Sequence, residues 1–295
     1  MGRDQKILVA GVGELLWDIF PSGRRIGGAP ANFAAHCMAL GSDARVLSKI
    51  GDDEDGQALL AEIKKLGLPS DTIMVDADMP TGTVNVVLDH EMHPSYVISE
   101  DVSWDYLLST PELEVMAAKF DAICFGTLAQ RNEVSRQTIQ KLVASTPING
   151  LRIFDVNLRQ HYFSPEIVER SLSLANVFKL SDEELPVICQ MLDVHGEMEE
   201  QLLALMKRFN LEVVALTRGR KGSILVTPED KSISNGENIE VVDTVGAGDS
   251  FTAALCLGLL KNLPLDKINS NASRIAAYVC SQTGAIPLLP RYLHF

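Results

Sequence analysis

The sequence predicts an α/β fold, a doubly wound and mostly parallel sheet with helices on both faces and a small β lid. Short β-branched runs alternate with amphipathic helical stretches for most of the 295 residues, an order typical of a parallel sheet covered by helices. One helix-free hairpin interrupts the alternation and predicts the lid. No linker, repeat or low-complexity tract divides the chain, so we expect residues 1–295 to form a single domain.

The first half of the chain begins with a regular alternation of elements. An apolar run predicts a strand at 7–12, and the helix expected at 30–40 is terminated by Gly41. A second strand follows at 45–50. The next helix, at 57–66, places its leucine and isoleucine residues on one face, which is the pattern of a helix packed on a sheet.

Residues 80–98 then break this order. Strands at 82–88 and 95–98 flank a polar tip, and no helix lies between them, which predicts a hairpin. The tip contains His90 and His93. These two histidines have no third candidate ligand nearby, so we expect them to be solvated and not to hold a metal.

The alternation resumes in the second half of the chain. Buried strands are expected at 122–125, 153–156, 177–180, 213–217 and 223–226. Helices are expected at 134–144, 182–192, 248–261 and 266–282.

The composition restricts the classes of partner. Hydrophobic residues make up 46% of the chain and charged residues 22%, enough apolar content for a folded core. The net charge of −13 argues against nucleic acid or an anionic membrane as the main partner. It also requires that any phosphate site be made locally positive by backbone N–H groups, a few basic side chains or a metal ion.

The cysteines and the apolar runs bear on where the protein is located in the cell. The five cysteines are scattered and form no C-x-x-C pair, so we expect reduced core thiols and neither disulfides nor a zinc site. The N-terminal apolar stretch is too short for a signal peptide, and no run approaches the length of a membrane span. The cytoplasm is the expected location.

The segment 242–251, Val-Asp-Thr-Val-Gly-Ala-Gly-Asp-Ser-Phe, carries the clearest chemical pattern. Gly246 and Gly248 permit a tight turn whose backbone approaches a ligand closely. The helix that follows has an apolar face, so its start is anchored and directs free N–H groups and the positive end of its dipole at an anion. On the residues alone, Asp249 in the first turn is either a functional carboxylate beside that anion or a capping acid.

Two motifs together resemble those of the PfkB-type carbohydrate kinases, in the ribokinase-like superfamily. Asp-Thr-Val-Gly-Ala-Gly-Asp-x-Phe at 243–251 is similar to the C-terminal signature, and Gly-Gly-Ala-Pro-Ala-Asn-Phe-Ala at 27–34 is similar to the N-terminal one. Their order and separation match, so the resemblance covers nearly the whole chain. It implies a ribokinase-like fold with a β lid, in agreement with the pattern of elements.

The resemblance also implies roles for individual residues. Asp249 takes the position of the catalytic base, and the anion hole corresponds to Gly246, Ala247 and Gly248. The positions similar to sugar-binding ones are Asp18, Gly28 and Asn32. The positions similar to those beside the nucleotide are Thr217, Gly219, Gly222, Ala276, Val279 and Cys280.

Two shorter elements complete the resemblance. Asp155-Val156-Asn157-Leu158-Arg159 resembles the D-x-N-x-R element of sugar-acid and fructose kinases, which implies that Arg159 approaches phosphate or substrate. The alternative is an arginine paired with a neighbouring carboxylate. Ser181-Asp182-Glu183-Glu184 resembles an N-x-x-E element with Ser in place of Asn, and Glu184 implies contact with Mg²⁺ through water.

The implied reaction is transfer of the γ-phosphoryl group of ATP to a sugar hydroxyl. ATP and Mg²⁺ are the expected cofactors, and a monovalent cation such as K⁺ is a further candidate. The G-G-A-P-A-N form of the first signature is typical of fructokinases, so fructose, converted to fructose 6-phosphate, is the expected sugar. The alternatives are a kinase of 2-keto-3-deoxygluconate, ribose or a nucleoside, and a kinase-like regulatory protein without catalysis. A dinucleotide site after the first strand is excluded, because Leu16 stands at the third glycine position.

The resemblance also bears on association between subunits. We expect the lid to be formed by about residues 15–27 and 80–100. Lid strands in this superfamily often pair between subunits, so a homodimer through the lid is expected, with Val84 and Val86 facing outward.

Overall fold

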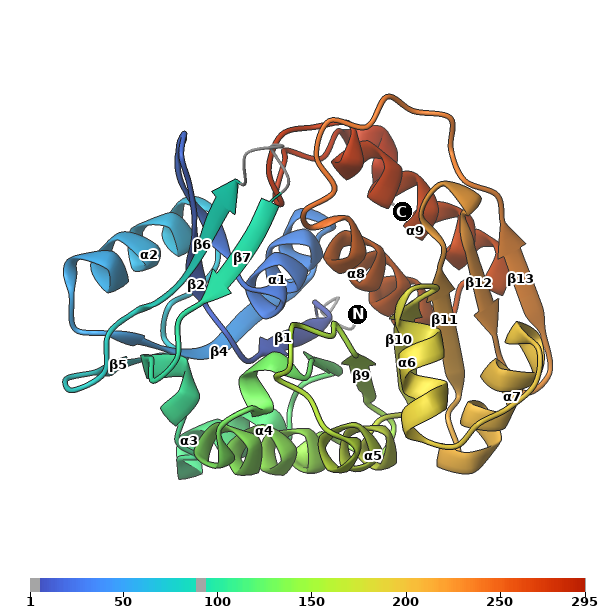
Figure 1. Cartoon of the computed structure of the whole chain (residues 1–295), viewed down its shortest axis with the longest axis horizontal. Coiled ribbons are helices and arrows are strands. Elements are labelled where there is room, and N and C mark those ends of the chain that lie inside the picture. Colours follow the sequence, from blue (N-terminus) through green and yellow to red (C-terminus); the bar gives the residue numbers. More distant parts are fainter. Residues whose placement is uncertain (1–5, 89–93, 295) are drawn as a thin grey trace, which may run out of the picture.

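A mostly parallel sheet runs through the centre of the molecule (Figure 1). The strands of this sheet are β1 (Leu8–Val12), β4 (Asp43–Gly51), β5 (Ile73–Asp76), β8 (Ala122–Phe125), β9 (Leu151–Asp155), β10 (Val177–Ser181), β11 (Val213–Thr217), β12 (Ser223–Val226) and β13 (Lys231–Ser234). The computed structural model describes residues 6–88 and 94–294, and within these ranges the order of the nine strands is β13-β12-β11-β10-β9-β8-β1-β4-β5. Neighbouring strands from β5 to β11 run parallel, and β12 and β13 form an antiparallel edge. The predicted fold class is confirmed.

Helices cover both faces of this sheet (Figure 1). These helices are α1 (Ala29–Ala39), α2 (Glu54–Lys65), α3 (Pro111–Ala117), α4 (Glu133–Ser145), α5 (Pro165–Leu174), α6 (Glu184–Met191), α7 (Met198–Phe209), α8 (Ala247–Leu260) and α9 (Leu265–Cys280). One apolar core holds the buried residues of α3 to α7, and a second holds those of α1, α2, α8 and α9. The central strands contribute alternate residues to each core, because side chains in a strand point to opposite faces in turn. In the first core Phe154 stacks with Phe125 and Phe178 at ring distances of 5.3 and 5.7 Å.

The second sheet corresponds to the predicted lid. Its strands are β2 (Leu16–Phe20), β3 (Gly23–Gly27), β6 (Gly82–Leu88) and β7 (Pro94–Ile98), in the order β3-β2-β6-β7. The two segments expected to form the lid, about 15–27 and 80–100, are therefore joined into one sheet, although about 55 residues separate them in the chain. The expected hairpin tip with His90 and His93 lies outside the described residues.

The register of this sheet corrects one prediction. Val84 is opposite Asp18 on β2 and Ile98 on β7, and directly paired residues share a face. Val84 and Ile98 are buried, so Val84 faces inward and its expected outward orientation was wrong. Asn85 and Val97 form the exposed pair instead. The strand has valines in both phases, so its pattern could not identify the buried face, and the side chain of Val86 lies outside the description.

Some elements were not predicted individually. β5, β13, α3, α5 and α7 have no counterpart among the expected elements, and α2 begins at Glu54 instead of residue 57. All five cysteines are free thiols, of which Cys280 is only partly buried. No helix in the described part of the chain has the length and apolar character needed to cross a membrane.

Candidate active site

The candidate site lies where the strand order reverses. β1 has β4 on one side and β8 on the other. The chain adds β4 and β5 on the first side and then β8 and the later strands of this sheet on the second. In open α/β sheets, ligands bind beyond the carboxyl ends of the strands at such a reversal. At this edge of the sheet Glu14 follows β1, and polar residues end the strands beyond β8: Asp155 ends β9, Ser181 ends β10 and Thr217 ends β11.

The turn before α8 has the predicted shape of an anion site. Gly246 is the N-terminal cap of the helix, with φ of +78°, and a Cβ there would lie 2.4 Å from the carbonyl oxygen of Ala285. Only glycine avoids both the strain and the collision. The cap provides no side-chain acceptor for the N–H groups of the first turn, which suits the turn to an anion, and the Ala247 N–H donates a 3.3 Å hydrogen bond to the Thr244 carbonyl oxygen.

Asp249 is directed at α1 and does not cap its own helix. Asn32 Nδ2 donates a hydrogen bond of 2.7 Å to Asp249 Oδ2, which joins the two signature motifs across 217 residues. Burial raises the pKa of Asp249, while the Asn32 hydrogen bond and the charges of Lys179 and Arg159 act against that rise. The interpretation of Asp249 as a capping acid was therefore wrong.

The inner face of the second sheet brings further charges to Asp249. Asp18 lies opposite Arg25 and so shares its face. Burial raises the pKa of Asp18 to about 6, and the charges of Arg159, Asp249 and Arg25 all act on it.

Arg159 makes no ion pair within the described part of the chain, and its Nη1 donates to the Leu158 carbonyl at 3.2 Å. The alternative of a paired structural arginine is therefore not what the structure shows.

Glu14 lies close enough to Arg159 and Asp249 for their charges to act on it, and it was not among the predicted site residues. It is only 4% exposed, and its Oε1 accepts a 3.3 Å hydrogen bond from the N–H of Ala29 at the start of α1. Burial raises its pKa from 4.5 to about 7. Gly28 packs against the same loop, with φ of +104° and room for no Cβ beside the Glu14 carbonyl. A single glutamate within an otherwise apolar run was the available signal in the sequence.

A cavity of about 370 Å³ adjoins the turn before α8. The predicted residues that line it are Thr217, Gly219, Gly222, Ala247, Gly248, Ala276 and Cys280. Val279 does not line it, because this side chain is fully buried in the second core. Ser273, Ala277 and Cys280 occupy the side of α9 that faces the cavity, and Val279 occupies the other.

One wall of this cavity has no residue among the predicted ones. Gly236, Glu237, Ile239 and Val241 line it from the irregular segment between β13 and α8. Such a segment has no periodic pattern, so only the fold identifies its contacts. Ile239 and Val241 give the cavity an apolar surface suited to a flat aromatic ring, and the turn before α8 gives it a surface suited to anions.

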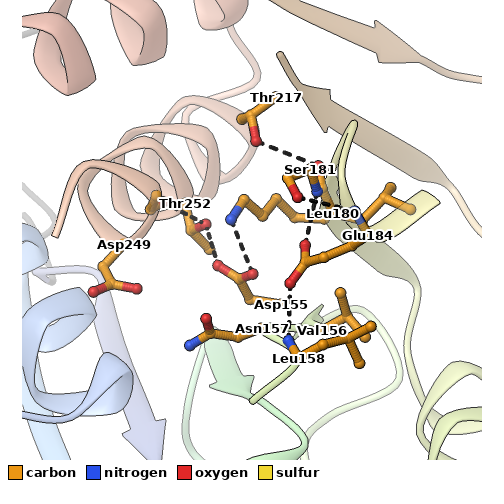
Figure 2. Close-up of polar contacts among 12 residues, drawn as sticks. Asp155, Val156, Asn157, Leu158, Leu180, Ser181, Glu184, Thr217, Asp249 and Thr252 are labelled. Carbon is orange, nitrogen blue, oxygen red and sulfur yellow. Dashed lines mark hydrogen bonds and ion pairs between the residues drawn. The ribbon is translucent and has the colours of Figure 1, made fainter. Parts of the chain in front are cut away.

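Glu184 holds two loops of the site together (Figure 2). Its Oε1 accepts from the N–H of Leu158 and its Oε2 from the N–H of Ser181, each at 2.8 Å. Ser181 Oγ accepts in return from the N–H of Glu184 at 3.2 Å, so the two residues exchange hydrogen bonds just before α6. Ser181 therefore makes these local contacts at the position where the N-x-x-E element has asparagine.

The donor set fits a magnesium ion carried by the substrate and not one held by a protein cage. No group of three or more acidic, histidine or cysteine side chains suited to a metal occurs among the described residues. Mg²⁺ commonly keeps several waters and binds one or two carboxylates plus phosphate oxygens. Each Glu184 oxygen has one lone pair beyond its backbone hydrogen bond, which is sufficient for contact through water.

Comparison with known proteins gives consistent matches over most of the chain. The model of the pfkB family carbohydrate kinases matches residues 22–291. An uncharacterized sugar kinase of Pyrococcus horikoshii is 30% identical over 298 residues, covering 94% of this chain and 91% of that protein. Its structure in complex with ATP aligns with a TM-score of 0.79 at 28% identity and covers 94% of each chain.

Two fructokinases also match. The fructokinase of Salmonella typhimurium is 28% identical over 297 residues, covering 95% of each chain. A structure of the fructokinase from Vibrio cholerae O395 with fructose, ADP and calcium ion aligns with a TM-score of 0.79 at 25% identity and covers 97% of each chain.

Proposed function

The chain belongs to the pfkB family of carbohydrate kinases, and we propose that within this family it converts fructose to fructose 6-phosphate with ATP. The observation that carries the proposal is the contact between Asp249 and Asn32 beside the open first turn of α8 and its cavity. The G-G-A-P-A-N form of the first signature and the two fructokinase relatives support fructose as the sugar.

In the proposed reaction Asp249 accepts the proton of the attacking sugar hydroxyl. A well-placed general base contributes a factor of about 10²–10⁴ to the rate. The N–H groups of Gly246, Ala247 and Gly248 stabilise the charge on the transferring phosphoryl group, at roughly 3 kcal/mol per well-placed donor. Positioning and charge stabilisation of this kind supply most of the catalysis in phosphoryl transfer.

The remaining site residues divide between the two substrates in this proposal. Asp18, Gly28 and Asn32 bind sugar hydroxyls from the inner face of the second sheet and α1, and Arg159 approaches phosphate or substrate. The nucleotide occupies the cavity, against Thr217, Gly219, Gly222, Ala276 and Cys280.

Two ions belong to the proposal. When bound, Mg²⁺ neutralises charge on the phosphate oxygens, and Glu184 contacts it through water. A monovalent cation such as K⁺ is proposed as an activator, which rates measured with potassium and with tetramethylammonium salts will test.

A coupled ADP-release assay tests the substrate. The panel contains fructose, ribose, 2-keto-3-deoxygluconate, adenosine and fructose 6-phosphate, and fructose is expected to give the highest kcat/KM. If another member exceeds it tenfold, about 1.4 kcal/mol of transition-state preference, the fructose assignment is wrong and the kinase assignment stands. Absence of turnover with every sugar would instead support a regulatory protein.

We also propose that two copies associate through the outer face of the second sheet. Val97 is 55% exposed on this face, opposite the exposed Asn85. Apolar residues exposed on a sheet are suited to a second copy of the same surface.

A further inference from the structure

A buried ion pair lies directly beneath the turn before α8. Lys179 on β10 and Asp155 at the end of β9 are 7% and 5% exposed, and Lys179 Nζ lies 3.0 Å from Asp155 Oδ1. Thr252 Oγ1 donates to the other carboxylate oxygen at 2.8 Å (Figure 2). The same hydroxyl lies 3.0 Å from the carbonyl oxygen of Gly248, so the pair is fixed to the first turn of α8.

The ammonium group lies close behind Gly248, which lines the cavity. A Cβ at Gly248 would lie 3.0 Å from Lys179 Nζ, and Gly248 itself lines the cavity. Asp155 and Asp249 line a second, smaller cavity together, so the ion pair also adjoins the predicted base. Because Gly248 has no side chain, none stands at this position between the ammonium and the first turn of α8.

The pair is not explained well by stability alone. Removing two charges from water costs several kcal/mol per ion, so a buried pair is often no more stable than apolar side chains of the same volume. Burial lowers the pKa of Lys179, but the charges of Asp155, Glu184 and Asp249 outweigh that effect and raise it. One permanent cation is therefore held among three carboxylates, at the place where a protein of net charge −13 needs positive charge.

We propose that Lys179 is a phosphate-binding residue, whose ammonium donates a hydrogen bond past Gly248 to the terminal phosphates of a bound nucleoside triphosphate. Asp155 is its partner in the free protein and positions it. An ammonium group has three N–H donors, so one can remain on Asp155 while another binds phosphate. This inference rests on the proposed use of the cavity by ATP.

The test compares binding of ATP with binding of adenosine, which has no phosphates. Lys179→Met alone leaves a buried carboxylate without its partner and risks unfolding the protein, so the substitution is made in an Asp155→Asn background. In Asp155→Asn itself the ammonium group keeps the charges of Glu184 and Asp249. Calorimetry on Asp155→Asn and on Asp155→Asn/Lys179→Met then isolates the ammonium group. The double variant is expected to bind ATP about 10- to 100-fold more weakly than Asp155→Asn, the range for loss of a charge-assisted hydrogen bond. Adenosine should bind both variants equally.

Each outcome has a separate meaning. Asp155→Asn alone should keep or raise the ratio of ATP to adenosine affinity, because it frees the ammonium group. A lower ratio in Asp155→Asn, or equal ratios in the two variants, would assign the pair a structural role and overturn the inference. A wild-type protein that binds no ATP would overturn the proposed function as well.

Discussion

At the scale of single residues, Asp249 is half-buried and is held in one orientation by its hydrogen bond from Asn32. Asp249→Asn keeps the shape and the contact with Asn32 but cannot accept a proton. We expect kcat to fall by about 10²–10⁴ while ATP affinity changes little. Because burial raises the pKa of Asp249, wild-type kcat/KM should decline with falling pH at higher values than for an exposed aspartate.

Steady-state kinetics across pH measure both effects. The matched control is Asp266→Asn, which removes an exposed carboxylate from the first turn of α9 and should leave kcat unchanged. A near-normal kcat in Asp249→Asn would remove Asp249 from its role as base.

Glu14 gives a pH dependence of stability at the same scale. Its pKa is about 7 in the folded protein and near 4.5 when solvated, so the folded state holds its proton more tightly. The resulting stabilisation is fully present below pH 4.5 and is lost as the pH rises through 7. The loss is of the order of 3 kcal/mol in the free energy of unfolding.

Urea unfolding at pH 5 and pH 7.5 tests this prediction in the wild type and in Glu14→Gln. The variant is neutral at both values, so its stability should decline less between them. Asp18 and Asp155, whose pKa values are also raised to about 6, lower the stability of both proteins over the same pH range. Their contribution therefore cancels when the two declines are compared. An equal decline in the two proteins would contradict the assignment to Glu14.

At the scale of elements, the turn before α8 depends on its surroundings as well as on its backbone. Gly246 and Gly67 both have φ of +78°, but a Cβ at Gly67 would have no atom within 4 Å. Gly67→Ala should therefore cost only the strain of a left-handed alanine, about 1–2 kcal/mol. Gly246→Ala adds the collision with Ala285, so it should cost more and displace the first turn of α8.

Urea unfolding and ATP calorimetry on both variants separate the two effects. We expect Gly246→Ala to weaken ATP binding by at least about tenfold, comparable to one lost charge-assisted hydrogen bond, and Gly67→Ala to leave it unchanged. Equal ATP affinity in the two variants would mean that the turn does not bind phosphate.

At the scale of the whole molecule, the second sheet should move over the site. Asp18 lies on its inner face, so sugar binding should draw the sheet inward and protect its backbone. Hydrogen exchange in β2, β3, β6 and β7 should slow with saturating fructose, while β12 and β13 at the far edge of the main sheet remain unchanged. Identical exchange in both states would contradict closure.

The proposed dimer has its own test at this scale. Val97→Glu places a charge on the outer face of the second sheet and should convert dimers to monomers in light scattering. Val115→Glu is the control, because Val115 is 59% exposed on α3, outside that sheet. A wild type that is monomeric, or a Val97→Glu variant that stays dimeric, would contradict association through this face.

The sequence by itself determined the fold class and the two signature motifs. Buried strands such as β8, β11 and β12 were predicted with their observed bounds, because a strand covered on both faces is a continuous apolar run. The tight turn before α8 was predicted as well, since Gly246 and Gly248 are local requirements of backbone geometry. Elements such as β13, which lies at the sheet edge with exposed Ile233, lack that continuous run and were missed.

Only the tertiary structure decided which residues meet. The contact of Asn32 with Asp249, the inward direction of Val84 and the burial of Val279 depend on how distant elements pack. Lys179 illustrates the reason most clearly. It lies in an otherwise apolar strand just before the element at 181–184, and that local pattern names no spatial partner for it. Strand order places its ammonium group beside Asp155 and beneath Gly248. A local pattern reports the conformation of a segment, whereas a site is a set of distances between segments, which packing alone sets.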